Sequence, residues 1–131
     1  MRCIANFEPP VVNVCVPPPP LNLSLEIRQE GGALFEYLVD TYQVPSMAPG
    51  GGDVAIYPTA VAASGAAEID RYTWNLDCFG GTDIPGPNPL ETLTAAGVSG
   101  ANWTGPCTVT VTALDRCGSM ASATTKFVLT P

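Results

Sequence analysis

Hydrophobic and polar residues alternate along the C-terminal part of the chain. Threonine and valine alternate strictly from Thr108 to Thr112, which places the valines on one face of an extended segment and hydroxyl groups on the other. Residues 115–119 are polar, contain a glycine and predict a turn; β-branched and aromatic residues resume from Ala121 to Leu129. The pattern predicts two strands joined as the last hairpin of an antiparallel β domain.

The same alternation appears near the N-terminus. From Leu21 to Gln29, leucines and an isoleucine occupy every second position, which predicts a half-buried strand. Residues 33–44 fit a strand or a short helix, and their aromatic and β-branched content favours the strand. Since Gly31 and Gly32 offer a turn between the two segments, we expect a hairpin over residues 21–44.

A further strand, residues 69–77, carries the largest side chains of the C-terminal half. Tyr72, Trp74 and Leu76 share one face of it, so it is expected to be the central strand of the core. We expect the Val109 and Val111 face of the late hairpin to pack against these three side chains.

Proline and glycine divide the chain into three parts. Residues 1–20 form a proline-rich arm, in which residues 17–20 predict a polyproline II rod of roughly 12 Å. Residues 45–52 predict a linker, so residues 21–52 are expected to be a hairpin with its linker and residues 53–131 a separate domain. The valine-rich piece of the arm is either part of a spacer or an edge strand that adds to a neighbouring subunit.

Charge and composition narrow the range of partners. The chain has 131 residues and a net charge of −7, which repels phosphate backbones and anionic lipid, so neither nucleic acid nor a membrane is an expected partner. No stretch approaches the ~20 apolar residues of a membrane span. After Arg2, an acidic residue and two prolines stand where an apolar signal core would be, which predicts synthesis in the cytoplasm without an N-terminal signal.

The five cysteines do not suggest a metal site. The sequence has no Cys-x₂-Cys pair and no histidine, so it fits no zinc pattern. An odd number leaves at least one cysteine outside any intrachain framework. Without a signal segment, the sequence favours reduced thiols buried as small hydrophobic side chains.

Enzyme chemistry is not expected either. Without histidine, the usual Ser/His and Cys/His catalytic pairs cannot be assembled. The single lysine, Lys126, lies in the last predicted strand and no glycine-rich phosphate loop is present. We therefore expect no enzyme activity, no cofactor and no metal; the aspartates at 70, 77, 83 and 115 are interpreted as solvated turn residues, with a Ca²⁺ site at one end of a sandwich as the alternative.

Four segments of the chain form a pattern: Ser64-Gly65, residues 72–76 (Tyr-Thr-Trp-Asn-Leu), residues 108–115 with Gly118, and the closing residues 121–125. Together they resemble the PKD domain, an immunoglobulin-like β-sandwich. Where that family has Asp-Phe-Gly-Asp-Gly, this chain has Asp77-Cys-Phe-Gly-Gly81 after Leu76, so a role of the acidic turn does not carry over. The resemblance implies an all-β, immunoglobulin-like antiparallel sandwich over residues 53–131, preceded by the proline-rich arm and hairpin.

These features favour a non-enzymatic structural protein, most concretely a phage capsid decoration or cement protein at the virion surface. Its N-terminal part would bind other protein subunits, so that the chain is a homo-oligomer or part of a large assembly. The expected partner-binding residues are apolar side chains of the arm and the first strand: Val11, Val12, Val14, Val16, Leu21, Leu23 and Leu25.

A second hypothesis is a secreted or surface module that binds carbohydrate or protein. Trp103 lies in a predicted loop and Tyr57 in a predicted strand, and both are candidate platforms for surface recognition. This hypothesis places the protein outside the cell.

Overall fold

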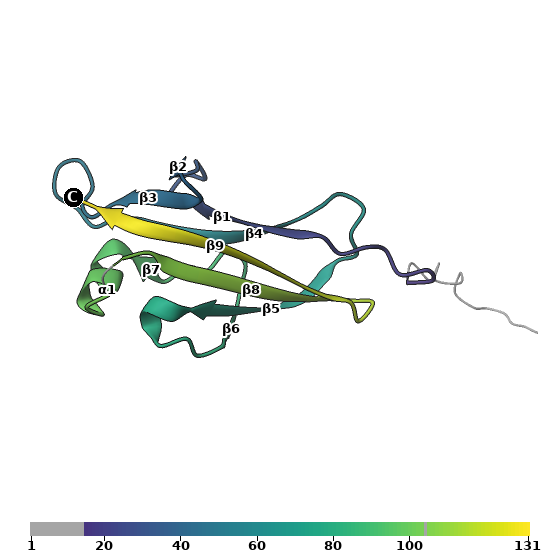
Figure 1. Cartoon of the computed structure of the whole chain (residues 1–131). Coiled ribbons are helices and arrows are strands. Elements are labelled where there is room, and N and C mark those ends of the chain that lie inside the picture. The colour runs from purple at the N-terminus through teal and green to yellow at the C-terminus, as the bar shows by residue number, and fades with distance from the viewer. Residues whose placement is uncertain (1–14, 104) are drawn as a thin grey trace, which may run out of the picture.

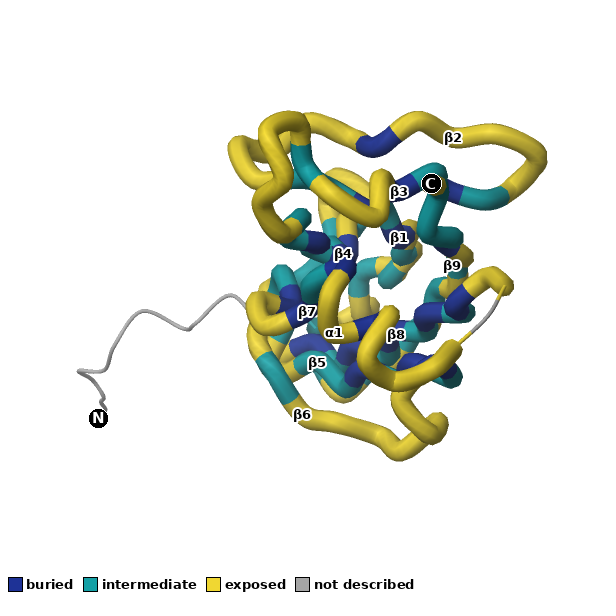
Figure 2. Tube along the Cα trace, turned by 90° about the vertical axis from the view of Figure 1, so that its left-hand side faces the viewer, coloured by how far each residue is buried: buried dark blue, intermediate teal, exposed yellow. Residues whose placement is uncertain are grey.

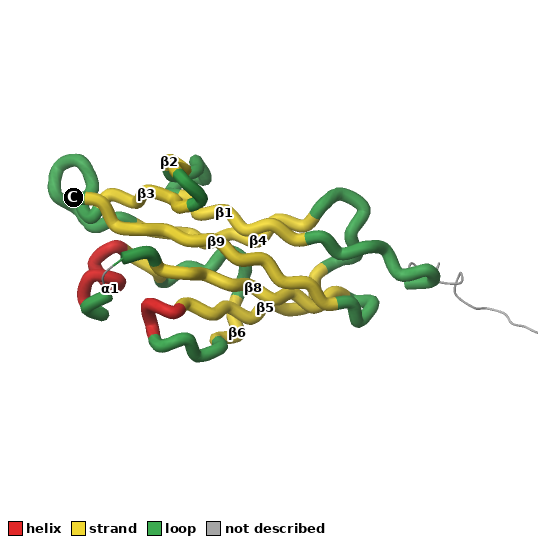
Figure 3. The backbone as a smooth tube through the Cα atoms, in the orientation of Figure 1, coloured by secondary structure: helices red, strands yellow, loops and turns green. Residues whose placement is uncertain are grey.

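The computed structural model describes residues 15–103 and 105–131, and these residues fold as a β-sandwich. One sheet has three strands in the order β1-β4-β7. The other has six strands in the order β2-β3-β9-β8-β5-β6 (Figure 1). In the described residues, strands and the loops between them dominate, with a 3₁₀ turn at Asp77–Phe79 and the short helix α1 at Ala95–Gly100 (Figure 3). The strand bounds are β1 Leu23–Arg28, β2 Glu36–Leu38, β3 Thr41–Pro45, β4 Ala55–Ala62, β5 Ile69–Leu76, β6 Ile84–Gly86, β7 Leu93–Thr94, β8 Cys107–Asp115 and β9 Met120–Thr130.

The predicted late hairpin is present as β8 and β9. The two strands pair antiparallel from Cys107↔Phe127 to Leu114↔Met120. Strand β8 alternates buried and half-buried positions along its length, as its valine–threonine pattern requires. On its other side β8 pairs with β5, which brings Trp74 beside Val111.

The core lies between the two sheets (Figure 2). Trp74, Leu76, Val109 and Val111 are buried there, and Tyr72 packs against them while remaining half-buried. The indole Nε1 of Trp74 donates a hydrogen bond of 2.9 Å to the Pro87 carbonyl, so the one polar atom of this large side chain is satisfied.

The N-terminal hairpin differs from the expectation. Strand β1 pairs antiparallel with β4 in the three-stranded sheet, whereas β3 pairs in parallel with β9 in the six-stranded sheet. The connection between them contains β2, which forms a tight hairpin with β3. The six-stranded sheet is therefore mixed rather than purely antiparallel, because the chain crosses from one sheet to the other between β1 and β3.

This crossing also changes the expected division into domains. Leu25, Ile27 and Val44 are buried in the same core as Trp74 and Phe127. The segment 21–52, which the proline- and glycine-rich linker had separated from the sandwich, supplies strands to both of its sheets. Residues 46–52 form a surface loop that allows the chain to pass from β3 to β4, and the described residues share one core.

Candidate functional site

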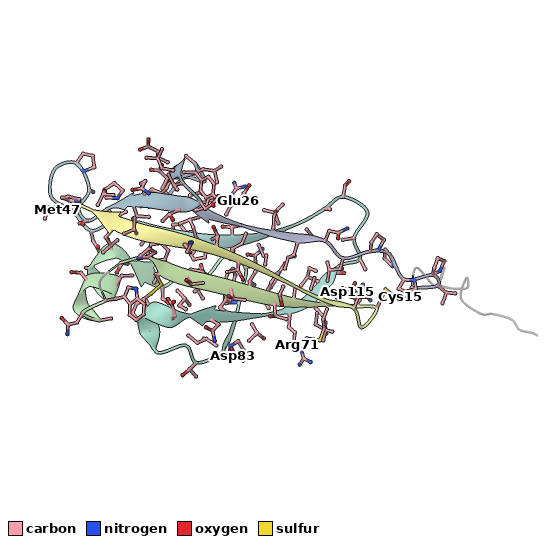
Figure 4. The ribbon with its side chains drawn as sticks, viewed as in Figure 1. Cys15, Glu26, Met47, Arg71, Asp83 and Asp115 are labelled. Carbon is pink, nitrogen blue, oxygen red and sulfur yellow. A yellow bond between two sulfur atoms is a disulfide. The ribbon has the colours of Figure 1, made fainter. Side chains whose placement is uncertain are left out.

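A disulfide closes one end of the sandwich. Cys15 is bonded to Cys117 with a Cα–Cα distance of 5.2 Å, although 102 positions separate them in the sequence. Cys117 lies in the turn between β8 and β9, where Gly118 adopts a φ of 85° that favours glycine. Cys15 and Asp115 lie together at this end (Figure 4), and the C-terminus lies at the other (Figure 1). We call the Cys15–Cys117 disulfide, together with the turn between β8 and β9 that it holds, the clamp.

Asp115 builds the turn that presents Cys117. Its Oδ1 accepts hydrogen bonds of 2.8 Å from the backbone N–H groups of Cys117 and Ser119. Its own N–H donates to the Ser119 carbonyl, and the N–H of Gly118 donates back to the Asp115 carbonyl. The carboxylate is 2% exposed, and its Oδ2 has no hydrogen-bond partner within the described part of the chain. Burying an oxygen without a hydrogen-bond partner costs free energy, so this turn carries a desolvation penalty at Asp115 Oδ2.

The clamp determines how force from the N-terminal arm enters the domain. Without the disulfide, a pull on the residues before Cys15 would act first on β1, which is an edge strand of the small sheet. With it, the same pull acts on the turn between β8 and β9, strands that lie inside the six-stranded sheet. Because β8 pairs with neighbours on both sides, the clamp ties the arm to the most extensively hydrogen-bonded part of the fold.

The expectation of reduced thiols is corrected by the structure. A second disulfide joins Cys78, which follows β5, to Cys107, the first residue of β8. The fold brings together cysteines that are 29 and 102 positions apart, and neither spacing forms a local motif from which the pairing could be read. The fifth cysteine, Cys3, lies outside the described residues.

One group of potential metal ligands occurs among the described residues, and it is structural. Asp77, Cys78 and Cys107 place their ligand atoms within 4.8 Å of one another. The two sulfurs are already bonded to each other, and Asp77 Oδ1 accepts a hydrogen bond of 2.8 Å from the N–H of Thr108. The structure does not bring the four predicted Ca²⁺ ligands together at one end of the sandwich, because Asp70 lies near one end of β5 and Asp77 follows the other end.

The outer face of β5, β8 and β9 carries a ladder of polar side chains. The strand register places Asn75, Thr110 and Thr124 in one row and Thr73, Thr112 and Ser122 in the next. The hydroxyls of Thr110 and Thr124 lie 3.1 Å apart, and those of Thr112 and Ser122 lie 2.9 Å apart. In each pair one hydroxyl donates to the other, which leaves one donor proton and several lone pairs directed to solvent.

A shallow polar hollow of about 420 Å³ lies on this ladder. Asn75 Nδ2 donates to Asp83 Oδ1 at 2.8 Å, which fixes the carboxylate at the rim. A neighbouring hollow shares part of this lining and extends toward Arg71. Figure 4 shows Arg71 nearer the clamp than Asp83. The polar hollow is lined by Thr73, Asn75, Asp83, Thr110, Thr112 and Met120. Such a surface can bind a hydroxyl-rich ligand by hydrogen bonds.

The predicted partner-binding residues separate into different environments. Val11, Val12 and Val14 lie outside the described residues. Val16 is 72% exposed, beside the clamp. Leu23 packs against the core and Leu25 belongs to it, so these two leucines hold β1 in the sandwich, whereas Leu21 precedes β1 and is half-buried. The alternation of apolar residues in this segment predicts that one face of the strand is buried, but it does not show whether that face packs on the chain's own sandwich or on a partner.

The two aromatic candidates lie on different elements. Trp103, in the loop before β8, is 36% exposed, and its Nε1 donates to the Pro106 carbonyl at 2.9 Å. Tyr57 is half-buried on the outward side of β4, between the buried Ile56 and Pro58. The polar hollow contains neither of them. Sequence reasoning missed this hollow because strand register, rather than sequence, brings Asn75 and Asp83 next to the threonines of β8.

The comparisons give no relative from which a function could be transferred: no family model, no curated protein and no solved structure matches the chain. Among the described residues, no helix has the length and apolar character needed to cross a membrane.

Proposed function

We propose that this protein is a non-enzymatic structural module that attaches to a larger assembly through the residues before Cys15 and displays its sandwich outward. The observation that carries the proposal is the Cys15–Cys117 disulfide. A covalent bond between the start of the described chain and a central hairpin is useful where the N-terminal arm is held by something else. The C-terminus at the opposite end leaves the rest of the sandwich free to face solvent (Figure 1).

We also propose that the β-sandwich is of the immunoglobulin-like, PKD-like type. Two sheets enclose one core, and Trp74 is buried on a strand of the larger sheet, as in immunoglobulin domains. One feature departs from antibody domains, where the disulfide joins the two sheets. Here Cys78–Cys107 joins the end of β5 to the start of β8, neighbours in one sheet.

The setting that we propose is a surface exposed to an oxidising environment. Disulfides persist there and are rare where cellular thiols keep cysteines reduced. A virion surface satisfies this requirement, and a phage capsid decoration or cement protein is the most concrete form of the proposal. The acidic, histidine-free sequence suits a display role better than catalysis or nucleic-acid binding.

The attachment is tested by removing residues 1–14 while keeping Cys15. We expect the shortened chain to unfold at the same denaturant concentration as the full chain but to remain in the supernatant when the full chain sediments with its particle. Equal sedimentation of the two proteins would reject attachment through the arm. A Val16→Ser variant of the full chain is the matched control for altering the exposed surface at the clamp.

A secreted or surface-bound recognition module is the second candidate, and the polar hollow favours it. Hydroxyl, amide and carboxylate groups on a flat sheet face match the hydrogen-bonding groups of a glycan. Binding in a glycan array that is lost in Asn75→Ala but kept in Trp103→Ala would support recognition by the hollow. The opposite result would assign recognition to the Trp103 loop.

A further inference from the structure

The hairpin of β2 and β3 exposes an apolar tip. We use this name, the tip, for Tyr37, Leu38 and Val39, which are 53%, 50% and 92% exposed. The ring of Tyr37 packs on that of Tyr42, with centroids 4.6 Å apart, which holds the hairpin in a defined position. The tip therefore presents Leu38 and Val39 to solvent on an ordered support.

Val39 has a backbone conformation that its side chain disfavours. The pairing of Leu38 with Thr41 leaves a two-residue turn, and both of its residues have positive φ, 50° at Val39 and 61° at Asp40. Turns of this kind prefer asparagine, aspartate or glycine, and a β-branched residue at positive φ is strained. Val39 is thus unfavourable for the turn and also exposes apolar surface, a combination expected where a residue contacts a partner.

An apolar hollow of about 280 Å³ lies at the opposite edge of the same sheet. Leu76, Leu90 and Leu93 form its buried floor. Phe79 and Ile84 at its rim are each 41% exposed, and Thr92 completes the lining. Strands β2 and β6 are the two edges of the six-stranded sheet, and they lie on opposite sides of the molecule in both views (Figures 1 and 2).

We propose that the tip of one copy docks into the apolar hollow of a second copy. A cavity of about 150 Å³ accommodates benzene, so the larger hollow has room for the short aliphatic side chains of Leu38 and Val39. The tip cannot reach the hollow of its own chain, because the body of the sheet separates them. Since the contact joins different surfaces on the two copies, it repeats from copy to copy and produces a row or a ring.

The contact is weak between isolated molecules. One hairpin tip in one hollow covers less than the ~1,000 Å² expected of a stable interface. Acidic side chains also lie on both sides, with Glu36 and Asp40 beside the tip and Asp83 and Glu91 beside the hollow. The contact therefore forms where copies are held at high local concentration. The proposed attachment to an assembly would supply that concentration, so in this respect the inference rests on the proposed function. Because salt screens the like charges, self-association should strengthen as salt rises.

A photocross-linker at the tip tests the contact directly in solution. A benzophenone amino acid replaces Val39 in the full chain, which is irradiated at ~1 mM protein in high salt, and the adducts are mapped by mass spectrometry. Intermolecular adducts at Phe79, Ile84 or Thr92 are expected. Adducts confined to other surfaces, or none, would overturn the proposal. The assay uses no particle, so a failure of attachment through the arm leaves its outcome unaffected.

Matched variants test the head-to-tail arrangement. Val39→Asn gives the turn a preferred residue, so we expect an equal or higher melting temperature together with self-association weakened about tenfold or more in sedimentation. Ile84→Glu, at the exposed rim, should weaken self-association similarly. A mixture of the two variants combines an intact tip with an intact hollow and should form dimers that neither forms alone. A mixture that stays monomeric, or a Val39→Asn protein that associates as strongly as the wild type, would contradict the proposal.

Discussion

Cys15 is covalently joined to Cys117, at the turn between β8 and β9, the two longest strands among the described residues. Both cysteines are half-buried, so replacing them removes little packing. The bond closes a loop of 102 residues, and the loss of that constraint on the unfolded chain should lower the free energy of unfolding by about 3–5 kcal/mol in Cys15→Ala/Cys117→Ala. Urea denaturation measures the change, and a loss below about 1 kcal/mol would contradict the role of this bond in stability.

The turn that carries Cys117 depends on the Asp115 carboxylate. In Asp115→Ala the N–H groups of Cys117 and Ser119 lose their acceptor, and we expect a loss of about 1–3 kcal/mol in unfolding free energy. Asp115→Asn keeps an acceptor oxygen for both N–H groups, while its amide nitrogen takes the place of the oxygen that has no partner in the described residues, so it should be the more stable of the two variants. Asn and Ala variants of equal stability would show that the two hydrogen bonds contribute nothing.

The structure also predicts a pH dependence. Burial raises the pKa of Tyr42 above its ordinary value, and the nearby Glu26 carboxylate raises this pKa further. Since the folded protein holds the phenol proton more tightly than the unfolded chain, this contribution to stability is fully present below pH about 10 and is lost as pH rises through the folded-state pKa. Wild type should therefore lose more unfolding free energy between pH 8 and 11 than Tyr42→Phe does. Tyr57→Phe is the control, and equal losses in wild type and Tyr42→Phe would contradict the prediction.

The N-terminal strand is expected to act as core rather than as anchor. Leu25→Ala removes a side chain that is only 8% exposed, so it should lower the free energy of unfolding by about 2–5 kcal/mol. Val16→Ala changes a side chain that is 72% exposed and should alter stability by less than about 0.5 kcal/mol. Similar stabilities of the two variants in urea denaturation would argue that β1 is not an integral strand.

Sequence alone predicts those parts of the fold that local alternation determines. The β8–β9 hairpin and the strand containing Trp74 follow from residues that are close in sequence and face one core. The crossing between β1 and β3 does not follow, because alternation shows that one face of a strand is buried but not which sheet the strand joins. The sequence does not predict the turn at Val39 and Asp40 for another reason: Val39 is an unfavourable residue for the positive φ that it adopts.

The candidate sites depend even more on tertiary structure. The Cys15–Cys117 pair joins the start of the described chain to the turn between β8 and β9, and the polar hollow combines side chains from neighbouring strands with Asp83 from a loop. The threonine alternation of β8 predicted a row of hydroxyls. Its neighbours on β5 and β9 required the strand register, which the sequence does not show.

The most direct test of the clamp is a single-molecule force measurement with handles fused to the two ends of the chain. With the disulfide intact, the residues from Cys15 to Cys117 remain tied together, and only the 14 residues after Cys117 can unravel from the sandwich. Because β9 is already extended in the folded protein, these residues span roughly 35–40 Å in the sandwich and about 50 Å when fully stretched, so unfolding should release only about 10–15 Å.

In Cys15→Ala, nearly the whole described chain can extend, except for the loop that the Cys78–Cys107 disulfide holds closed. This chain reaches about 300 Å when fully stretched, so after its folded end-to-end span of roughly 40 Å is subtracted, unfolding of the variant should release about 260 Å. A short release in wild type and a long one in the variant is the result that the clamped attachment predicts. A release of about 260 Å from the oxidised wild-type protein would contradict it.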